Sequence, residues 1–131
     1  MPIKVGQVYR LMCQTGTKPK VKYFVIALTA PCVCFVINST PTAFQLGQPV
    51  QMAALAPVFR AENQFLHHDS YVACNQLFAE YDEQAILDAV AADPNVYLGQ
   101  LGPNAHAAVV AALAGNRLIP RGRLALVTAA W

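Results

Sequence analysis

The chain has 131 residues, which suits one domain of ordinary size, so we expect a single domain over residues 1–131. Hydrophobic residues make up 56% of the chain and charged residues only 12%, which excludes a disordered chain. The longest apolar run, residues 23–37, is too short for a membrane-spanning helix and contains Pro31. No signal peptide opens the sequence, so we expect a soluble cytoplasmic protein without a membrane partner. The net charge is +2, but the charges are unevenly distributed, with two basic ends and an acidic middle.

The first part of the chain has the pattern of an antiparallel meander. Residues 5–12 alternate in polarity, and residues 21–28 are rich in β-branched and aromatic side chains. Residues 32–38 are apolar on both faces, which predicts a central strand. Residues 14–20 contain Gly and Pro between basic and polar residues, which predicts a loop.

Weaker strand signals follow in the rest of the chain. A short strand is predicted at residues 50–55, and residues 71–74 and 77–81 continue the β-like pattern. Residues 118–119 and 124–127 predict a final short strand.

Two helices are predicted toward the C-terminus. Asp82 is a suitable N-cap for a helix over residues 83–92, which carries an apolar stripe. Pro103 suits the first position of a second helix that runs to about residue 114, where Gly115 ends it. The expected fold class is therefore β-rich α+β, with a small barrel-like sheet and two short helices.

Four cysteines are present, and two of them form a C-x-C pair at Cys32 and Cys34. The sequence has no CxxC and no second close pair that would complete a zinc site. We expect reduced, structural thiols and neither a metal nor another cofactor, with metal or disulfide chemistry as the alternative.

Candidate catalytic groups lie in two short polar segments. In His67-His68-Asp69-Ser70, adjacent histidines on a strand would face opposite sides, so we expect only His68 to share a face with Ser70. The alternative is a polar strand start in which Asp69 and Ser70 bond the backbone. Hydroxyl groups also follow the predicted central strand, at Ser39 and Thr40, where they suit either a binding site or an ordinary turn.

Basic and aromatic residues gather near the N-terminus, where no acid accompanies them. If the first two strands pair, we expect Tyr9, Arg10, Lys20 and Lys22 to lie on the same side. Cations of this kind clamp phosphates, and aromatic rings stack on bases. The alternative is a solvated loop whose lysines keep an apolar protein in solution. The full set of expected RNA-binding residues is Tyr9, Arg10, Lys18, Lys20 and Tyr23.

Three segments resemble the MazF/PemK-like toxins. Residues 6–11, Gly-Gln-Val-Tyr-Arg-Leu, are similar to the opening strand of that family, which begins Gly-Asp/Glu-Ile/Val-Tyr/Trp. The basic loop and residues 23–28, Tyr-Phe-Val-Ile-Ala-Leu, resemble its first loop and second strand. Residues 96–101, Val-Tyr-Leu-Gly-Gln-Leu, with the Ala-rich helix after them, resemble its Ile-Gly-x-Leu segment and C-terminal helix.

The resemblance implies an SH3-like barrel, a dimer, and a metal-independent endoribonuclease that an antitoxin protein blocks. The family carries an Arg-Pro pair at the entry to its second strand, whereas this chain has Pro19 followed by Lys20, Val21 and Lys22. A lysine neutralises a phosphate but lacks the planar fork of arginine. The hydroxyl residue that follows the family's next strand corresponds to Ser39 or Thr40.

The function expected from these observations is that of a toxin-type endoribonuclease acting on single-stranded RNA. Lys22 would stabilise the phosphorane, Ser39 or Thr40 would position the phosphate, and His68 would act as acid or base. The alternative is a non-catalytic module on the same fold that binds nucleic acid or protein. The apolar excess predicts a homodimer in either case.

Overall fold

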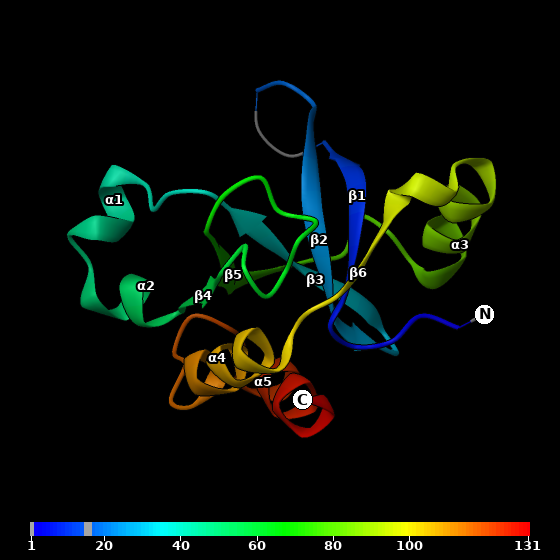
Figure 1. Cartoon of the computed structure of the whole chain (residues 1–131). Helices are drawn as coiled ribbons and strands as arrows, with labels where there is room; N and C mark the ends of the chain where they lie inside the picture. The colour runs from blue at the N-terminus through cyan, green and yellow to red at the C-terminus, as the bar shows by residue number, and fades with distance from the viewer. Residues whose placement is uncertain (1, 15–16) are drawn as a thin grey trace.

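The computed structural model describes residues 2–14 and 17–131, and it is a mixed α+β protein built on one curled, six-stranded antiparallel sheet that forms a half-barrel (Figure 1). Residues 15 and 16 of the predicted loop, and residue 1, lie outside the described part. The strands are β1 (Gln7–Cys13), β2 (Lys20–Thr29), β3 (Cys32–Asn38), β4 (Leu55–Val58), β5 (Ser70–Phe78) and β6 (Tyr97–Gln100).

The strand order in the sheet is β4-β5-β3-β2-β1-β6. The predicted meander is therefore confirmed, because β1 pairs with β2 and β2 with β3, all antiparallel. The predicted central position of β3 is confirmed as well, since β3 lies between β2 and β5 and five of its seven residues are buried. The SH3-like identity of the barrel stays a prediction.

The prediction of only two helices was wrong, because five α-helices and one 3-10 helix occur in the described residues. They are α1 (Ala43–Leu46), α2 (Pro49–Ala53), α3 (Glu83–Ala92), η1 (Pro94–Val96), α4 (Pro103–Leu113) and α5 (Arg121–Ala130). The two helices that were predicted, α3 and α4, are present, and Asp82 caps α3 by accepting a hydrogen bond from the backbone N–H of Ala85.

Two of the predicted strands were wrong in position or type. Residues 49–53 form α2 because Pro49 suits the first turn of a helix, and the strand β4 begins only at Leu55. Residues 124–127 belong to α5, in which Val127 is buried and Leu124 and Trp131 pack beside it. This spacing of three and four residues follows one face of a helix. Residues 118–119 form no strand.

Helices cover both faces of the sheet and enclose two separate cores. On one face, α4 and α5 pack against β4 and β2 around fully buried side chains such as Val25 and Phe35. On the other face, α3 inserts Ile86 against Phe24 and Ile26. Figure 1 shows α4 and α5 below the sheet and α3 at its side, which leaves the β1–β2 hairpin projecting beyond both cores.

Candidate functional site

The register of β1 against β2 decides which basic side chains share a face. Leu11 lies opposite Lys22 and Cys13 opposite Lys20, so both lysines project on the face of the α3 core. Arg10 lies opposite Tyr23, on the other face of the sheet. The expectation that Arg10 shares a side with the two lysines was therefore wrong, because the side-chain direction alternates along each strand.

Tyr9 does share the face of the lysines, but its ring is only 5% exposed. Its hydroxyl donates to Gln7 Oε1 at 2.8 Å, and its ring packs on Tyr97 with a centroid distance of 5.3 Å. Burial and the neighbouring Tyr97 raise the pKa of Tyr9 to about 12. Tyr9 is thus a core residue, and the prediction that its ring stacks on RNA was wrong.

Two hollows meet where β2 begins and β3 ends. The histidine hollow, of about 590 Å³, contains most of the predicted catalytic groups; it is lined by Val21, Lys22, Tyr23, Ile37, Asn38, Ser39, Thr40, Thr42, Leu66, His67, His68 and Ser70. The amide hollow, of about 380 Å³, has lysines on one side and amides on the other; it is lined by Cys13, Thr17, Lys18, Lys20, Lys22, Val36, Asn38, Gln45, Ala73, Asn75, Gln76 and Phe78.

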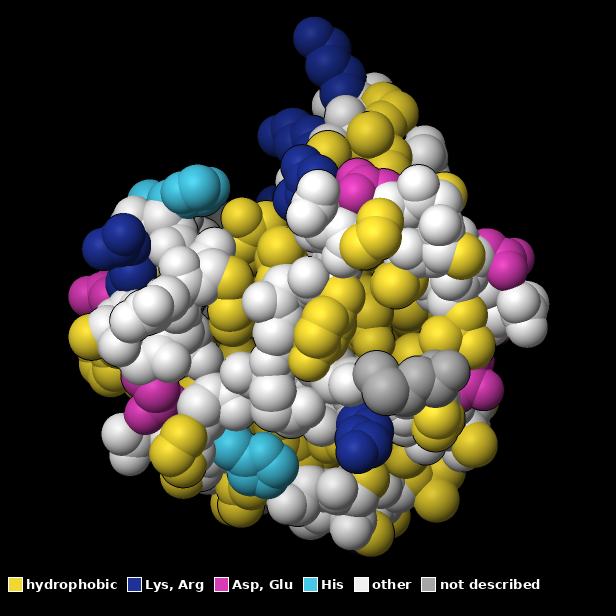
Figure 2. Space-filling view, turned by 45° about the vertical axis from the view of Figure 1, so that its right-hand side comes forward, with side chains coloured by type: hydrophobic (Ala, Val, Ile, Leu, Met, Phe, Trp, Pro, Cys, Tyr) yellow, Lys and Arg dark blue, Asp and Glu magenta, His cyan; other side chains and the backbone are white. Residues whose placement is uncertain are grey.

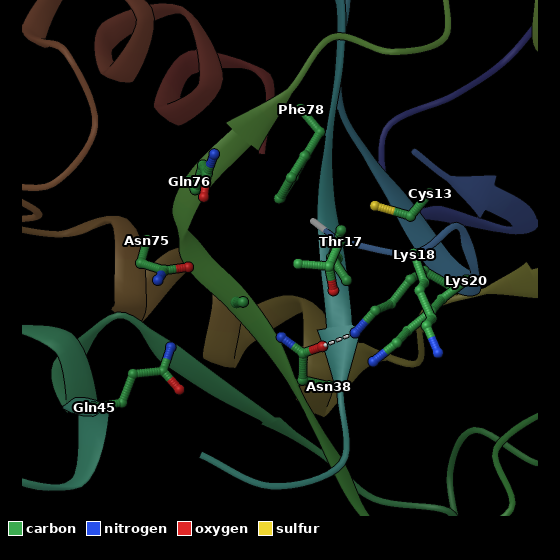
Figure 3. A pocket seen from close by; sticks show the side chains of 12 residues that line it. Cys13, Thr17, Lys18, Lys20, Asn38, Gln45, Asn75, Gln76 and Phe78 are labelled. Carbon is green, nitrogen blue, oxygen red and sulfur yellow. Dashed lines mark hydrogen bonds between the residues drawn. The ribbon is translucent and has the colours of Figure 1, made fainter. Parts of the chain in front are cut away.

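Lys22 and Asn38 line both hollows and join them. Lys22 Nζ donates a hydrogen bond of 3.0 Å to Asn38 Oδ1, which is the dashed line in Figure 3. Among the described residues, no acidic side chain lines either hollow, so the site is cationic. Figure 2 shows basic side chains gathered on the projecting hairpin and histidine side chains facing them across the hollowed surface. A negatively charged ligand suits such a site.

The segment that carries the two histidines, residues 59–69, is held at several points. Arg60 Nε donates to Leu66 O at 3.1 Å, and the Arg60 N–H donates to Asp69 Oδ1 at 2.9 Å. The Asn63 side chain, 2% exposed, accepts from the N–H of Gly102 at 2.8 Å and so ties the segment to the start of α4. The histidines are therefore carried by a braced loop rather than by a strand.

His67 was missed as a site residue. The expectation that only one of the two histidines faces the site rested on strand alternation, whereas residues 67 and 68 form a bend before β5 begins at Ser70. Both side chains are exposed and both line the histidine hollow. A bend lets consecutive side chains reach the same space, and Asp69 so close before a strand was the signal of such a turn.

The hydrogen bonds of Ser70 indicate which nitrogen of His68 carries the proton. Ser70 Oγ donates its single hydrogen to the carbonyl of His68 at 3.0 Å, and it also lies 3.3 Å from His68 Nδ1. A hydroxyl that has used its hydrogen can only accept in a second bond, so Nδ1–H donates to it. Nε2 of the neutral ring is then left with a lone pair, as a general base requires.

The predicted site residues thus divide into three groups. Lys22, Ser39, Thr40, His68 and Tyr23 line the histidine hollow. Lys18 and Lys20 line the amide hollow. Arg10 and Tyr9 line neither, for the reasons given above.

Among the residues that the structure describes, no three histidine, cysteine, aspartate or glutamate side chains gather as a set of metal ligands. Cys34 and Cys74 are buried free thiols, and burial raises the pKa of Cys74 to about 12. In the described part of the chain, no helix combines the length and the apolar character that crossing a bilayer requires.

Comparison with models of protein families gave no match, and neither the curated proteins nor the solved structures contain a match to this chain. The resemblance to the MazF/PemK-like toxins therefore stays a prediction.

Proposed function

We propose that this protein is a metal-independent endoribonuclease that cleaves single-stranded RNA in the histidine hollow. The observation that carries the proposal is the presence of Lys22, two exposed histidines and two hydroxyl groups, Ser39 and Thr40, around one cationic hollow. RNA carries its own nucleophile, the 2′-hydroxyl, so a protein has only to position the phosphate, transfer protons and stabilise charge.

The reaction that these groups suit is internal transesterification. His68 Nε2 removes the proton of the 2′-hydroxyl, whose oxygen attacks the phosphorus, and the 5′-oxygen leaves with a proton from His67. The products are a 2′,3′-cyclic phosphate and a 5′-hydroxyl end. Histidine suits both roles because the charge of an imidazole changes near neutral pH.

Lys22 supplies the electrostatic part of the mechanism. The extra negative charge of the phosphorane develops on its non-bridging oxygens, where a fixed ammonium group stabilises it. The bond from Lys22 Nζ to Asn38 holds the lysine at the junction of the two hollows. Lys22 stands close to where the resembling family carries arginine, and a lysine would give weaker, less directional stabilisation.

The proposal is tested by cleavage of a mixed-sequence single-stranded RNA in the presence of a chelator. We expect a cyclic phosphate product, no cleavage of a 2′-deoxy strand, and a loss of about 100-fold or more in kcat for His68→Ala, because general acid–base catalysis contributes about 10²–10⁴-fold. Cleavage that persists at the same rate in His68→Ala, or that also cuts the 2′-deoxy strand, contradicts the proposal.

Lys4→Ala is the matched control for Lys22→Ala, since both remove one positive charge and Lys4 lines neither hollow. We expect Lys22→Ala to lose cleavage and Lys4→Ala to retain it. In binding measurements, the double change Lys20→Ala with Lys22→Ala should reduce the slope of log affinity against log salt by about 0.7 for each RNA phosphate that the protein no longer neutralises. Equal salt slopes for the wild type and the double variant would show that neither lysine contacts an RNA phosphate.

A second candidate function is binding of a protein partner, favoured by exposed apolar side chains on α1 and α2. Phe44 is 66% exposed, Leu46 63% and Val50 47%. Such a group of side chains is typical of a surface that a partner covers, either a second copy of this chain or an antitoxin protein. Light scattering tests the second copy as the partner. A dimer predicts twice the monomer mass of 14.1 kDa for the wild type and a lower mass for Phe44→Ser, whereas a mass of 14.1 kDa for both contradicts a dimer through this surface.

A further inference from the structure

The amide hollow has hydrogen-bond donors whose orientation is fixed by their neighbours. Lysine can only donate, so Lys22 Nζ must meet the oxygen of Asn38, and Asn38 Nδ2 is left as a donor. The backbone N–H of Thr42 donates to Gln45 Oε1 at 2.8 Å within the capping box of α1, which leaves Gln45 Nε2 as a second donor. Gln45 is only 8% exposed, and the capping box holds its side chain in place.

Asn75 on β5 supplies a hydrogen-bond acceptor to the same hollow. Asn75 Nδ2 donates to Gln51 Oε1 at 3.2 Å, so Asn75 Oδ1 is left as an acceptor. In Figure 3 the side chains of Asn75 and Gln45 lie across the hollow from Lys18 and Lys20, with Asn38 between the two groups. Asn38, Gln45 and Asn75 therefore present two amide donors and one amide acceptor to the hollow, beside a row of ammonium groups.

An apolar ring closes the same space. Phe78 lines the hollow and is held by an edge-to-face contact with Phe24, at a centroid distance of 6.3 Å. Aromatic rings of this kind stack on nucleobases, and the lysines opposite suit the phosphates on either side of the base. The volume of about 380 Å³ lies near the lower end of the range for small-ligand sites.

We propose that the amide hollow is a nucleobase subsite that selects a keto base, with uracil as the best match. This inference rests on the proposed function, because it places the base of a bound RNA next to the Lys22–Asn38 junction, at which the histidine hollow begins. The Watson–Crick edge of uracil is acceptor, donor, acceptor, which complements the Asn38 and Gln45 donors and the Asn75 acceptor. Cytosine replaces one carbonyl by an amino group, which would meet an amide donor.

Binding of labelled 2′-O-methyl oligouridine and oligocytidine of equal length tests this inference, because these strands resist cleavage and differ only in the base. Fluorescence anisotropy should show about tenfold tighter binding of oligouridine by the wild-type protein. Gln45→Glu keeps the oxygen that accepts from Thr42 and replaces the Nε2 donor by an acceptor, so the preference for uracil should disappear.

Gln76→Glu is the matched control, because it adds the same charge to the same wall and leaves the Gln45 donor intact. It should weaken both oligomers equally and retain the preference. Equal binding of the two oligomers by the wild type, with equal competition by inorganic phosphate, shows an anion site only and overturns the inference. So does a preference for uracil that survives in Gln45→Glu. Circular dichroism checks that each variant is folded.

The cleavage assay separates this inference from the proposed function. Cleavage without a base preference in binding contradicts the uracil subsite and leaves the ribonuclease proposal standing. A preference for uracil without any cleavage supports the subsite and contradicts the catalytic roles of His67 and His68. A wild-type protein that binds neither oligomer contradicts both.

Discussion

Replacing Glu62 with alanine should destabilise the protein, because this carboxylate caps the helix α4 from a distant segment. The N-cap residue of α4, Gly102, has no side chain to accept the first free N–H groups. Glu62 Oε1 accepts from the N–H of Asn104 at 3.0 Å and from that of Ala105 at 3.1 Å, and Oε2 accepts from Asn104 Nδ2 at 2.6 Å. Glu62 lies within the braced loop, residues 59–69, so its loss should loosen the histidines as well.

The size of the effect follows from these three bonds. Loss of an N-cap side chain costs about 0.5–2 kcal/mol, and a carboxylate beside a helix N-terminus adds about 0.3–1 kcal/mol. Asn104 is exposed, so water replaces part of the bonding that the substitution removes, and we expect a decrease of about 1–2 kcal/mol in the free energy of unfolding for Glu62→Ala. Glu62→Gln retains an acceptor oxygen and should lose about half as much.

Urea unfolding followed by circular dichroism measures this free energy, and a loss of this size should lower the unfolding midpoint by about 0.5–1 M. Asp88→Asn is the matched control. It removes one negative charge from α3, where the carboxylate accepts from the exposed side chain of Gln84 at 2.8 Å, and it should stay within about 0.5 kcal/mol of the wild type. Amide hydrogen exchange across residues 59–69 should quicken in Glu62→Ala. A Glu62→Ala variant as stable as Asp88→Asn would refute the capping argument.

Three further predictions concern the cores and the thiols. Burial raises the pKa of Tyr9 from 10.0 to about 12, so its contribution to stability is complete below pH 10.0 and is lost as the pH rises toward 12. Urea unfolding across this range should show that the free energy of unfolding falls less steeply with pH in Tyr9→Phe than in the wild type. A hydrogen bond between the two thiols lowers the pKa of the half-buried Cys32 and raises the pKa of the buried Cys34. Because the thiolate is the reactive form, mass spectrometry after brief iodoacetamide treatment at neutral pH should find the label on Cys32 before Cys34. Trp131 Nε1 donates to Ala27 O at 2.9 Å, so Trp131→Phe, which removes the bond and keeps an aromatic ring, should cost about 1 kcal/mol in thermal unfolding. Trp131→Ala, which also removes the ring, should cost about 2–4 kcal/mol, and a Trp131→Phe variant as stable as the wild type would show that the bond contributes nothing.

The strands of the meander and the two longer predicted helices were predictable because their signals are local. Alternation, β-branched composition and caps act over a few residues, and residues 32–38 and Asp82 show these signals directly. The helix α5 was missed because residues 124–127 are too few to distinguish a period of two from a period of 3.6. The wider spacing of Leu124, Val127 and Trp131 contains the helical signal.

The site was less predictable than the fold because it depends on contacts between distant segments. The chemistry of Lys22, Ser39 and His68 indicates them as candidates in the sequence, and the pairing of β3 with β5 brings them to one hollow. Gln45 and Asn75 carry no motif, and they meet Asn38 only because α1 follows β3 while β5 pairs beside it. Composition predicts none of these relationships.

The junction at Lys22 and Asn38 links the two proposals physically. A base held by Asn38 Nδ2 would fix the same amide whose oxygen accepts from Lys22, so base recognition and the position of the catalytic ammonium share one side chain. A correct base would then orient Lys22 toward the phosphate, whereas a wrong base would compete for the Asn38 amide and release the lysine. The preference for uracil over cytosine should therefore appear in kcat as well as in binding, because Lys22 reaches the phosphate only when the base and the phosphate are both in place.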